Sequence, residues 1–93
     1  MGGNISPSAA EVLSGNKILE TCKNPDEIAQ GICIGYVSGA EENLASILAI
    51  TKVTTVQKQD IFIQYLKNNP KDRHKMAFLL FVGSMKEAYP CPK

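Results

Sequence analysis

The sequence contains few of the residues that carry out catalysis or bind metal ions. Its 93 residues include one histidine, His74, and three cysteines, and none of these has C-x-x-C or H-x-x-H spacing. Gly31, Gly35 and Gly39 lie within a helical pattern without a preceding strand, which argues against a phosphate-binding loop. An enzyme needs a nucleophile, an acid/base pair or a metal held in a pocket. We therefore predict a protein that is not an enzyme and that has no cofactor and no metal.

The chain also lacks a strong charge of either sign and a long apolar run. Ten lysine and arginine residues stand against nine acidic residues, and the basic residues are scattered instead of forming a stripe. This pattern argues against nucleic acid as a partner. The longest apolar run, Met76 to Val82, is much shorter than the roughly 18 residues of a membrane helix. We expect no membrane span.

No segment shows the alternation of a half-buried strand between hairpin turns. The patterns that are present are helical, and they predict an all-α fold, a compact bundle of four to five helices. The length allows one modest core, which a disulfide would support. We expect a flexible N-terminal arm over residues 1–9 and a single helical domain over residues 10–93.

Two helices are predicted in the first half of the chain. The first covers residues 10–22, or only 14–22, because Gly15 weakens its first half. The second follows Asn24, which is expected to be its N-cap, and extends over residues 25–48 with proline and acids in its first turn. Acidic side chains there complement the positive end of the helix dipole.

Two pairs of residues on the second helix suggest surface functions. Gly35 and Gly39 lie one turn apart, which we interpret as a place for close packing of another helix in preference to a kink. Glu41 and Glu42 are expected to face water, where a paired acidic patch can meet a basic partner.

Two more helices are predicted in the second half. Thr54 and Gln57 have the spacing of a capping box, and the helix that they begin is expected to end before Pro70. The last helix is predicted over residues 71–88. Its centre, residues 76–82, is apolar on every side, which is typical of the central helix of a bundle.

Four segments in order resemble one known family. They are Cys22, the stretch GICIGYVSG over 31–39, the pair Thr54 and Gln57 with YLKNNPKDRH over 65–74, and AYPC over 88–91. Together they resemble the Tai/Rap family of immunity proteins, which neutralise peptidoglycan amidase effectors of type VI secretion. The resemblance covers about residues 14–91.

The resemblance implies a location, a partner and an assembly. Family members are small helical proteins of the Gram-negative periplasm, and we expect that Met1-Gly2-Gly3 replaces an export signal. They bind a cognate amidase effector as homodimers, with a loop of one subunit in the active-site cleft and a helix of the other assisting. A homodimer is expected to expose an apolar patch outside the core. The alternative function is a helical adaptor or chaperone-like module for another protein, and a DNA-binding helical domain ranks last.

The cysteines depart from the family pattern, which usually has another cysteine, often followed by proline, between the second and third helices. Residues 49–53 contain neither, so at most one disulfide forms. We predict a bond between Cys22 and Cys33 with Cys91 unpaired. The alternative is a bond between Cys33 and Cys91.

The effector-binding loop is predicted at the polar, turn-forming connection before the last helix, and the connector around Lys52 is the alternative. Arg73 stands beside Asp72 and is expected to form an ion pair or cap with it. Pro70, Arg73 and His74 match the family pattern, so these three residues are expected to be structural. The predicted effector-binding residues are Asn68, Asn69, Pro70, Lys71, Asp72, Lys52, Glu41 and Glu42.

Overall fold

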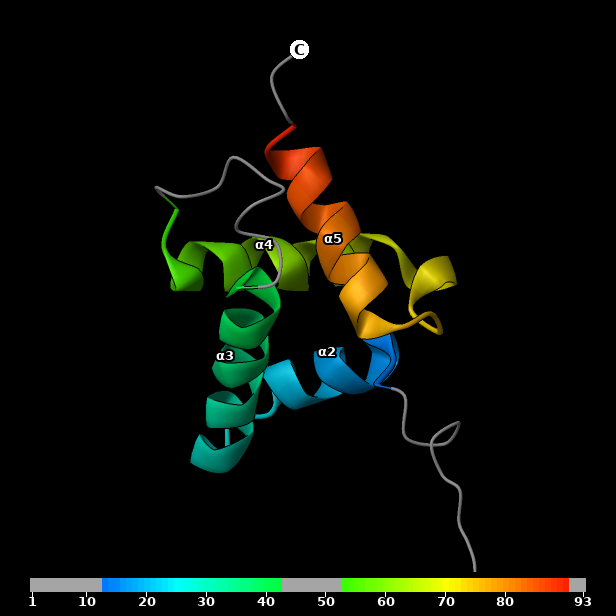
Figure 1. Cartoon of the computed structure of the whole chain (residues 1–93). Coiled ribbons are helices and arrows are strands. Elements are labelled where there is room, and N and C mark those ends of the chain that lie inside the picture. The colour runs from blue at the N-terminus through cyan, green and yellow to red at the C-terminus, as the bar shows by residue number, and fades with distance from the viewer. Residues whose placement is uncertain (1–12, 43–52, 91–93) are drawn as a thin grey trace, which may run out of the picture.

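A computed structural model describes residues 13–42 and 53–90 of the chain (Figure 1). In these ranges the chain forms α2 (Gly15–Lys23), α3 (Glu27–Glu42), α4 (Thr55–Asn68), the 3₁₀ helix η1 (Pro70–Asp72) and α5 (Ala77–Ala88). The two described ranges contain no strand, only one isolated bridge between Ser14 and Met76. The predicted all-α fold is confirmed, whereas the predicted arm over residues 1–9 lies outside the described ranges.

The core forms where α4 contacts α2, α3 and α5. In Figure 1, α2 and α4 run roughly horizontally, and α3 and α5 run roughly vertically. Phe62 of α4 is fully buried at the centre, stacked on Tyr36 of α3 at 6.3 Å and edge-on to Phe81 of α5 at 5.3 Å. The other buried hydrophobic residues are Ile18, Leu19, Cys22, Cys33, Val37, Ala40, Leu66, Ala77, Leu80 and Met85.

The starts of α2 and α4 have side-chain caps. The Ser14 hydroxyl accepts from the Lys17 N–H at 3.2 Å, so α2 begins at the later of the two predicted positions. The predicted capping box of α4 is confirmed: the Gln57 N–H donates to Thr54 Oγ1 at 3.1 Å, and the Thr54 N–H donates to Gln57 Oε1 at 2.9 Å. Both caps satisfy backbone donors that have no partner within the helix.

The cap of α3 differs from the prediction. Asp26 Oδ2 accepts from the Ile28 N–H at 3.0 Å, so Asp26 caps the helix, and Asn24 does not. Asn24 Oδ1 instead accepts from the Asp26 N–H at 2.9 Å and so stabilises the turn between α2 and α3. The predicted extension of this helix to residue 48 passes out of the described ranges after Glu42.

Close packing occurs at a different glycine from the predicted pair. α3 continues through Gly35 and Gly39 as one helix, and a Cβ at either position would meet no described atom within 4 Å. The prediction of a closely packed helix there is wrong within the described ranges. At Gly15, an added Cβ would lie 3.0 Å from the Arg73 carbonyl oxygen and would also overlap Leu80. The absence of a side chain lets the start of α2 pack directly against the chain before α5.

The last helix begins only at Ala77, because the start of α2 pairs with the preceding segment. The Gly15 N–H donates to the Lys75 carbonyl at 2.9 Å, and the Ala77 N–H donates to the Leu13 carbonyl at 2.7 Å. These bonds hold residues 73–76 as a turn and a bend that end in the single bridge at Met76, so the predicted start at residue 71 is wrong. The prediction of an apolar helix buried on every side is wrong too, since Leu79 is 58% exposed.

Candidate functional site

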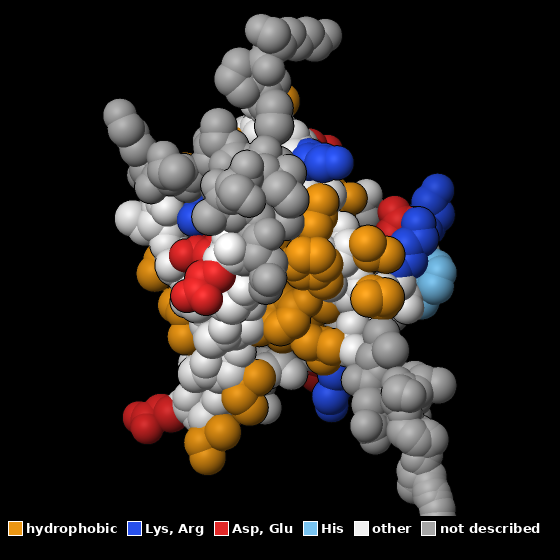
Figure 2. All heavy atoms as spheres, in the orientation of Figure 1, with side chains coloured by type: hydrophobic (Ala, Val, Ile, Leu, Met, Phe, Trp, Pro, Cys, Tyr) orange, Lys and Arg blue, Asp and Glu red, His pale blue; other side chains and the backbone are white. Residues whose placement is uncertain are grey.

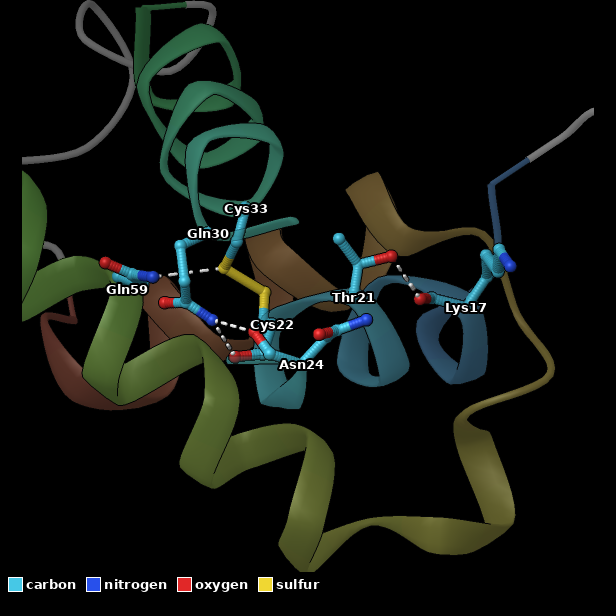
Figure 3. The surroundings of a disulfide bond; sticks show 7 residues. All are labelled: Lys17, Thr21, Cys22, Asn24, Gln30, Cys33 and Gln59. Carbon is cyan, nitrogen blue, oxygen red and sulfur yellow. Dashed lines mark hydrogen bonds between the residues drawn. A yellow bond between two sulfur atoms is a disulfide. The ribbon is translucent and has the colours of Figure 1, made fainter. Parts of the chain in front are cut away.

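A disulfide and two glutamines join α2, α3 and α4 (Figure 3). Cys22 and Cys33 are bonded, with their Cα atoms 5.1 Å apart. The Gln30 side chain donates to the Cys22 carbonyl at 3.0 Å, and Gln59 Nε2 of α4 donates to Cys33 Sγ at 3.1 Å. The structure therefore contains the first of the two predicted pairings, which excludes Cys33–Cys91; Cys91 itself lies outside the described ranges.

The connection from α4 to α5 is held by hydrogen bonds to backbone carbonyls. Asn69 Nδ2 donates to the Tyr65 carbonyl at 2.8 Å, and the Asp72 N–H donates to the Asn69 carbonyl at 3.0 Å. Pro70 begins η1 because its fixed φ suits the first position of a helix and it needs no amide partner. The predicted loop is thus a tight 3₁₀ turn with a defined shape, and Asn68, Pro70 and Lys71 are exposed on it.

This connection presents mainly basic side chains. Figure 2 shows lysine and arginine side chains and the single histidine gathered over it at one edge of the molecule. The one acid, Asp72, lies 3.1 Å from the Lys75 ammonium. The predicted pair between Asp72 and Arg73 is therefore replaced by a pair with Lys75. His74 is exposed, as expected for a surface residue.

Arg73 has a different environment from its neighbours. Its carbonyl accepts from the Asn16 N–H at 2.7 Å, which fixes the backbone against the start of α2. Its Nε atom is buried and has no hydrogen-bond partner. The sequence pattern predicted a structural pair for Arg73, and no residue in it indicated that Nε would be buried without a described partner.

The two predicted acidic residues at the end of α3 differ from each other. Glu41 lies 3.2 Å from the Lys58 ammonium of α4 and accepts from the Thr55 hydroxyl at 3.1 Å. The side chains of Lys58 and Glu41 are only 8% and 21% exposed. The expectation that Glu41 faces water is wrong, because its Oε1 atom is buried without a hydrogen bond to any described residue and has the Lys58 ammonium as an ion-pair partner. Glu42 is exposed at the helix end.

The structure separates the predicted site residues into two groups. Residues 68–72 follow the end of α4, and Glu41 contacts its first turn. A helix of this length places the two groups about 20 Å apart. Lys52 lies outside the described ranges. The α4–α5 connection is therefore one compact group of five predicted residues, and the acidic pair is a separate feature.

An apolar surface lies between α3 and α5 (Figure 2). A shallow groove there is lined by Tyr36, Ala40 and Phe78 together with Gly35 and Gly39. Partial burial raises the pKa of the Tyr36 hydroxyl above its ordinary value of 10.0. The resemblance to a dimeric family predicted such a patch, but periodicity could not locate it, because the last helix is apolar on every side.

Within the described ranges no three histidine, cysteine or acidic residues cluster as metal ligands, and none of the helices there is long and apolar enough to cross a membrane. The fold and the site together define a small, disulfide-linked helical protein with a structured basic connection on its surface. Residues 14–91 match the family of Rap1a immunity proteins, and the chain belongs to that family. Comparisons with curated proteins and with solved structures found no match. Membership in an immunity family indicates a role in binding an effector.

Proposed function

We propose that this protein is a periplasmic, non-enzymatic immunity protein that binds and inhibits a peptidoglycan amidase effector of type VI secretion. The observation that carries the proposal is the family match over residues 14–91. The disulfide between Cys22 and Cys33 supports the location, because disulfides persist in an oxidising compartment such as the periplasm.

The α4–α5 connection is the proposed inhibitory loop. The Asn69 side chain donates to the Tyr65 carbonyl, the Asp72 N–H donates to the Asn69 carbonyl, and the Arg73 carbonyl accepts from α2, so little ordering is needed on binding. A pre-organised loop loses less conformational entropy when it enters a cleft. Asn68, Pro70 and Lys71 are exposed there and are the proposed contacts.

The proposed homodimer uses the apolar surface between α3 and α5. Ile28 and Ile32 are 74% and 56% exposed on α3, and Leu79 is 58% exposed on α5. Ile28 and Ile32 line a second hollow, against α2, and exposed apolar patches are typical of sites that another protein covers. Sedimentation of the chain with and without a Leu79→Glu substitution tests this assignment, and a wild-type monomer would contradict it.

The amidase encoded beside this chain is the direct test of the function. We expect the two proteins to co-purify and the chain to abolish cleavage of peptidoglycan peptides at equimolar concentration. A Lys71→Glu substitution in the loop should weaken inhibition, and Lys86→Glu on the exposed last turn of α5 is its matched control. A wild-type chain that leaves amidase activity unchanged refutes the proposal. Capture of a non-hydrolase partner instead would favour the adaptor function.

A further inference from the structure

A cavity beside the α4–α5 connection is lined by Arg73, whose side chain forms no ion pair within the described ranges. It lies between α2 and Arg73, and its lining residues are Asn16, Leu19, Glu20, Lys23, Asn24 and Arg73. Within the described ranges, Arg73 Nε is buried and has no hydrogen-bond partner. A buried polar atom that loses water without gaining a partner lowers stability. Such a group in a native fold requires a reason.

The other polar groups of the cavity are mostly free to donate. Lys23 lies in the last turn of α2 and forms no ion pair within the described ranges. Asn24 Oδ1 is occupied by the Asp26 N–H, which leaves its amide nitrogen to donate. The one acid, Glu20, already lies 3.2 Å from the Lys17 ammonium on the exposed face of α2. The cavity therefore presents two cations that form no ion pair within the described ranges, and its one carboxylate already pairs with Lys17.

We infer that this cavity binds a carboxylate side chain of the effector, with Arg73 as the anchoring residue. A guanidinium presents parallel donors that match the two oxygens of a carboxylate. The inference rests on the proposed function, because Arg73 directly follows Pro70–Asp72 of the inhibitory loop. An aspartate or glutamate at the rim of the amidase cleft can thus enter the cavity while the loop enters the cleft.

The position of Arg73 also explains how the cavity is held open before binding. Its backbone is fixed by the bond from the Asn16 N–H, which a change of side chain leaves intact. The α2 wall is joined to α3 by the bond between Cys22 and Cys33. The site is therefore built into the fold, and its missing acceptor is the component that the effector supplies.

Arg73→Met tests the inference because it separates binding from stability. Removing a half-buried cation that has no described partner should leave Tm unchanged or raise it, while affinity for the adjacent amidase falls about 30-fold or more. Lys86→Met on α5 removes the same charge at a remote, exposed position and should change affinity by less than about threefold. Arg73→Lys keeps the charge and loses the planar fork, so we expect it to bind less tightly than wild type.

The outcomes distinguish this inference from the function on which it rests. A wild-type chain that does not bind the amidase refutes the proposed function. A wild-type chain that binds, with Arg73→Met binding equally well, refutes only the inference. A Tm that falls for Arg73→Met with unchanged affinity assigns Arg73 to structure instead.

Nuclear magnetic resonance gives a second measurement that does not depend on inhibition. The Arg73 Nε–H signal of the ¹⁵N-labelled chain should shift when the amidase is added. N-acetyl-aspartate amide at matched micromolar concentration should leave it in place. Saturation by that free carboxylate would make the cavity a small-molecule site and would overturn the assignment to a protein partner. No shift on addition of a bound amidase would also overturn it.

Discussion

The two ends of α4 use charge in opposite ways. At its first turn, Lys58 and Glu41 are almost enclosed and lie 3.2 Å apart, with Thr55 as an additional donor. Beyond its last turn, Arg73 has a buried Nε without an acceptor. A charge that the fold neutralises serves packing, whereas a charge that the fold leaves unpaired is available to a partner. We therefore expect the closed end to contribute mainly to stability, and we propose the open end as the part that contacts a partner.

The largest expected effect comes from breaking the closed end. Lys58→Ala leaves Glu41 partly buried without its counter-ion, so we expect the free energy of unfolding to fall by about 3 kcal/mol. Urea denaturation measures the change. The double variant Lys58→Met with Glu41→Leu removes both charges at similar volume and should recover most of the loss. A double variant as unstable as the single one would contradict the role of the pair.

We expect the second-largest loss of stability from removing the disulfide, which joins α3 to α2, the helix that lines the cavity at Arg73. It joins residues 11 apart in sequence. Replacing both Cys22 and Cys33 by alanine should lower the free energy of unfolding by about 2–3 kcal/mol, because the unfolded chain gains the freedom that a closed loop of this size removes. Thermal unfolding with and without reductant provides the comparison. A reduced wild type as stable as the oxidised one would refute this expectation.

Two glycine substitutions sharpen the contrast between packed and open surface. Gly15→Ala places a methyl group against Arg73 and Leu80, and we expect a loss of about 1–3 kcal/mol. Gly35→Ala lies in an exposed helix interior with open space around it, and should stabilise the protein by about 0.5–1 kcal/mol. Equal shifts in Tm for the two variants would show that α2 is not packed as described.

The smallest effect concerns Tyr36, on the same helix as Glu41. Burial raises the pKa of its hydroxyl above 10.0, so the folded protein retains the proton longer than the unfolded chain does. The contribution to stability is complete below pH 10 and decreases as the pH rises through the folded pKa. Tyr36→Phe should flatten the dependence of stability on pH above 10. An unchanged slope in the variant would assign that dependence to other groups.

Local signals in the sequence located the helices and several of their ends. Thr54 and Gln57 form the predicted capping box, and α4 ends before Pro70 as expected. These predictions succeeded because each depends on side chains within one turn of the residue that they cap. Asn24 was wrongly predicted to be the N-cap, because it accepts from the Asp26 N–H in the turn while Asp26, two residues on, accepts from the Ile28 N–H of the helix.

The candidate site was predicted as a segment but not as a set of interactions. The polar connection before the last helix is structured and exposed, and whether it binds an effector stays a prediction. The pairing of Glu41 with Lys58, and of Asp72 with Lys75 instead of Arg73, depends on which helices lie side by side and how the turn is shaped. Neither can be derived from periodicity along one helix.

By itself the sequence determined the helical class, the caps around α4, the ordered motifs of the immunity family and the small set of possible disulfides. Those features depend on neighbours along the chain or on composition. Only the tertiary structure decided that Cys22 pairs with Cys33, that Gly15 is the point of close approach, and that Lys58 is enclosed while Arg73 lacks an acceptor. The physical reason is that burial and charge pairing depend on segments far apart in sequence, which only packing brings together.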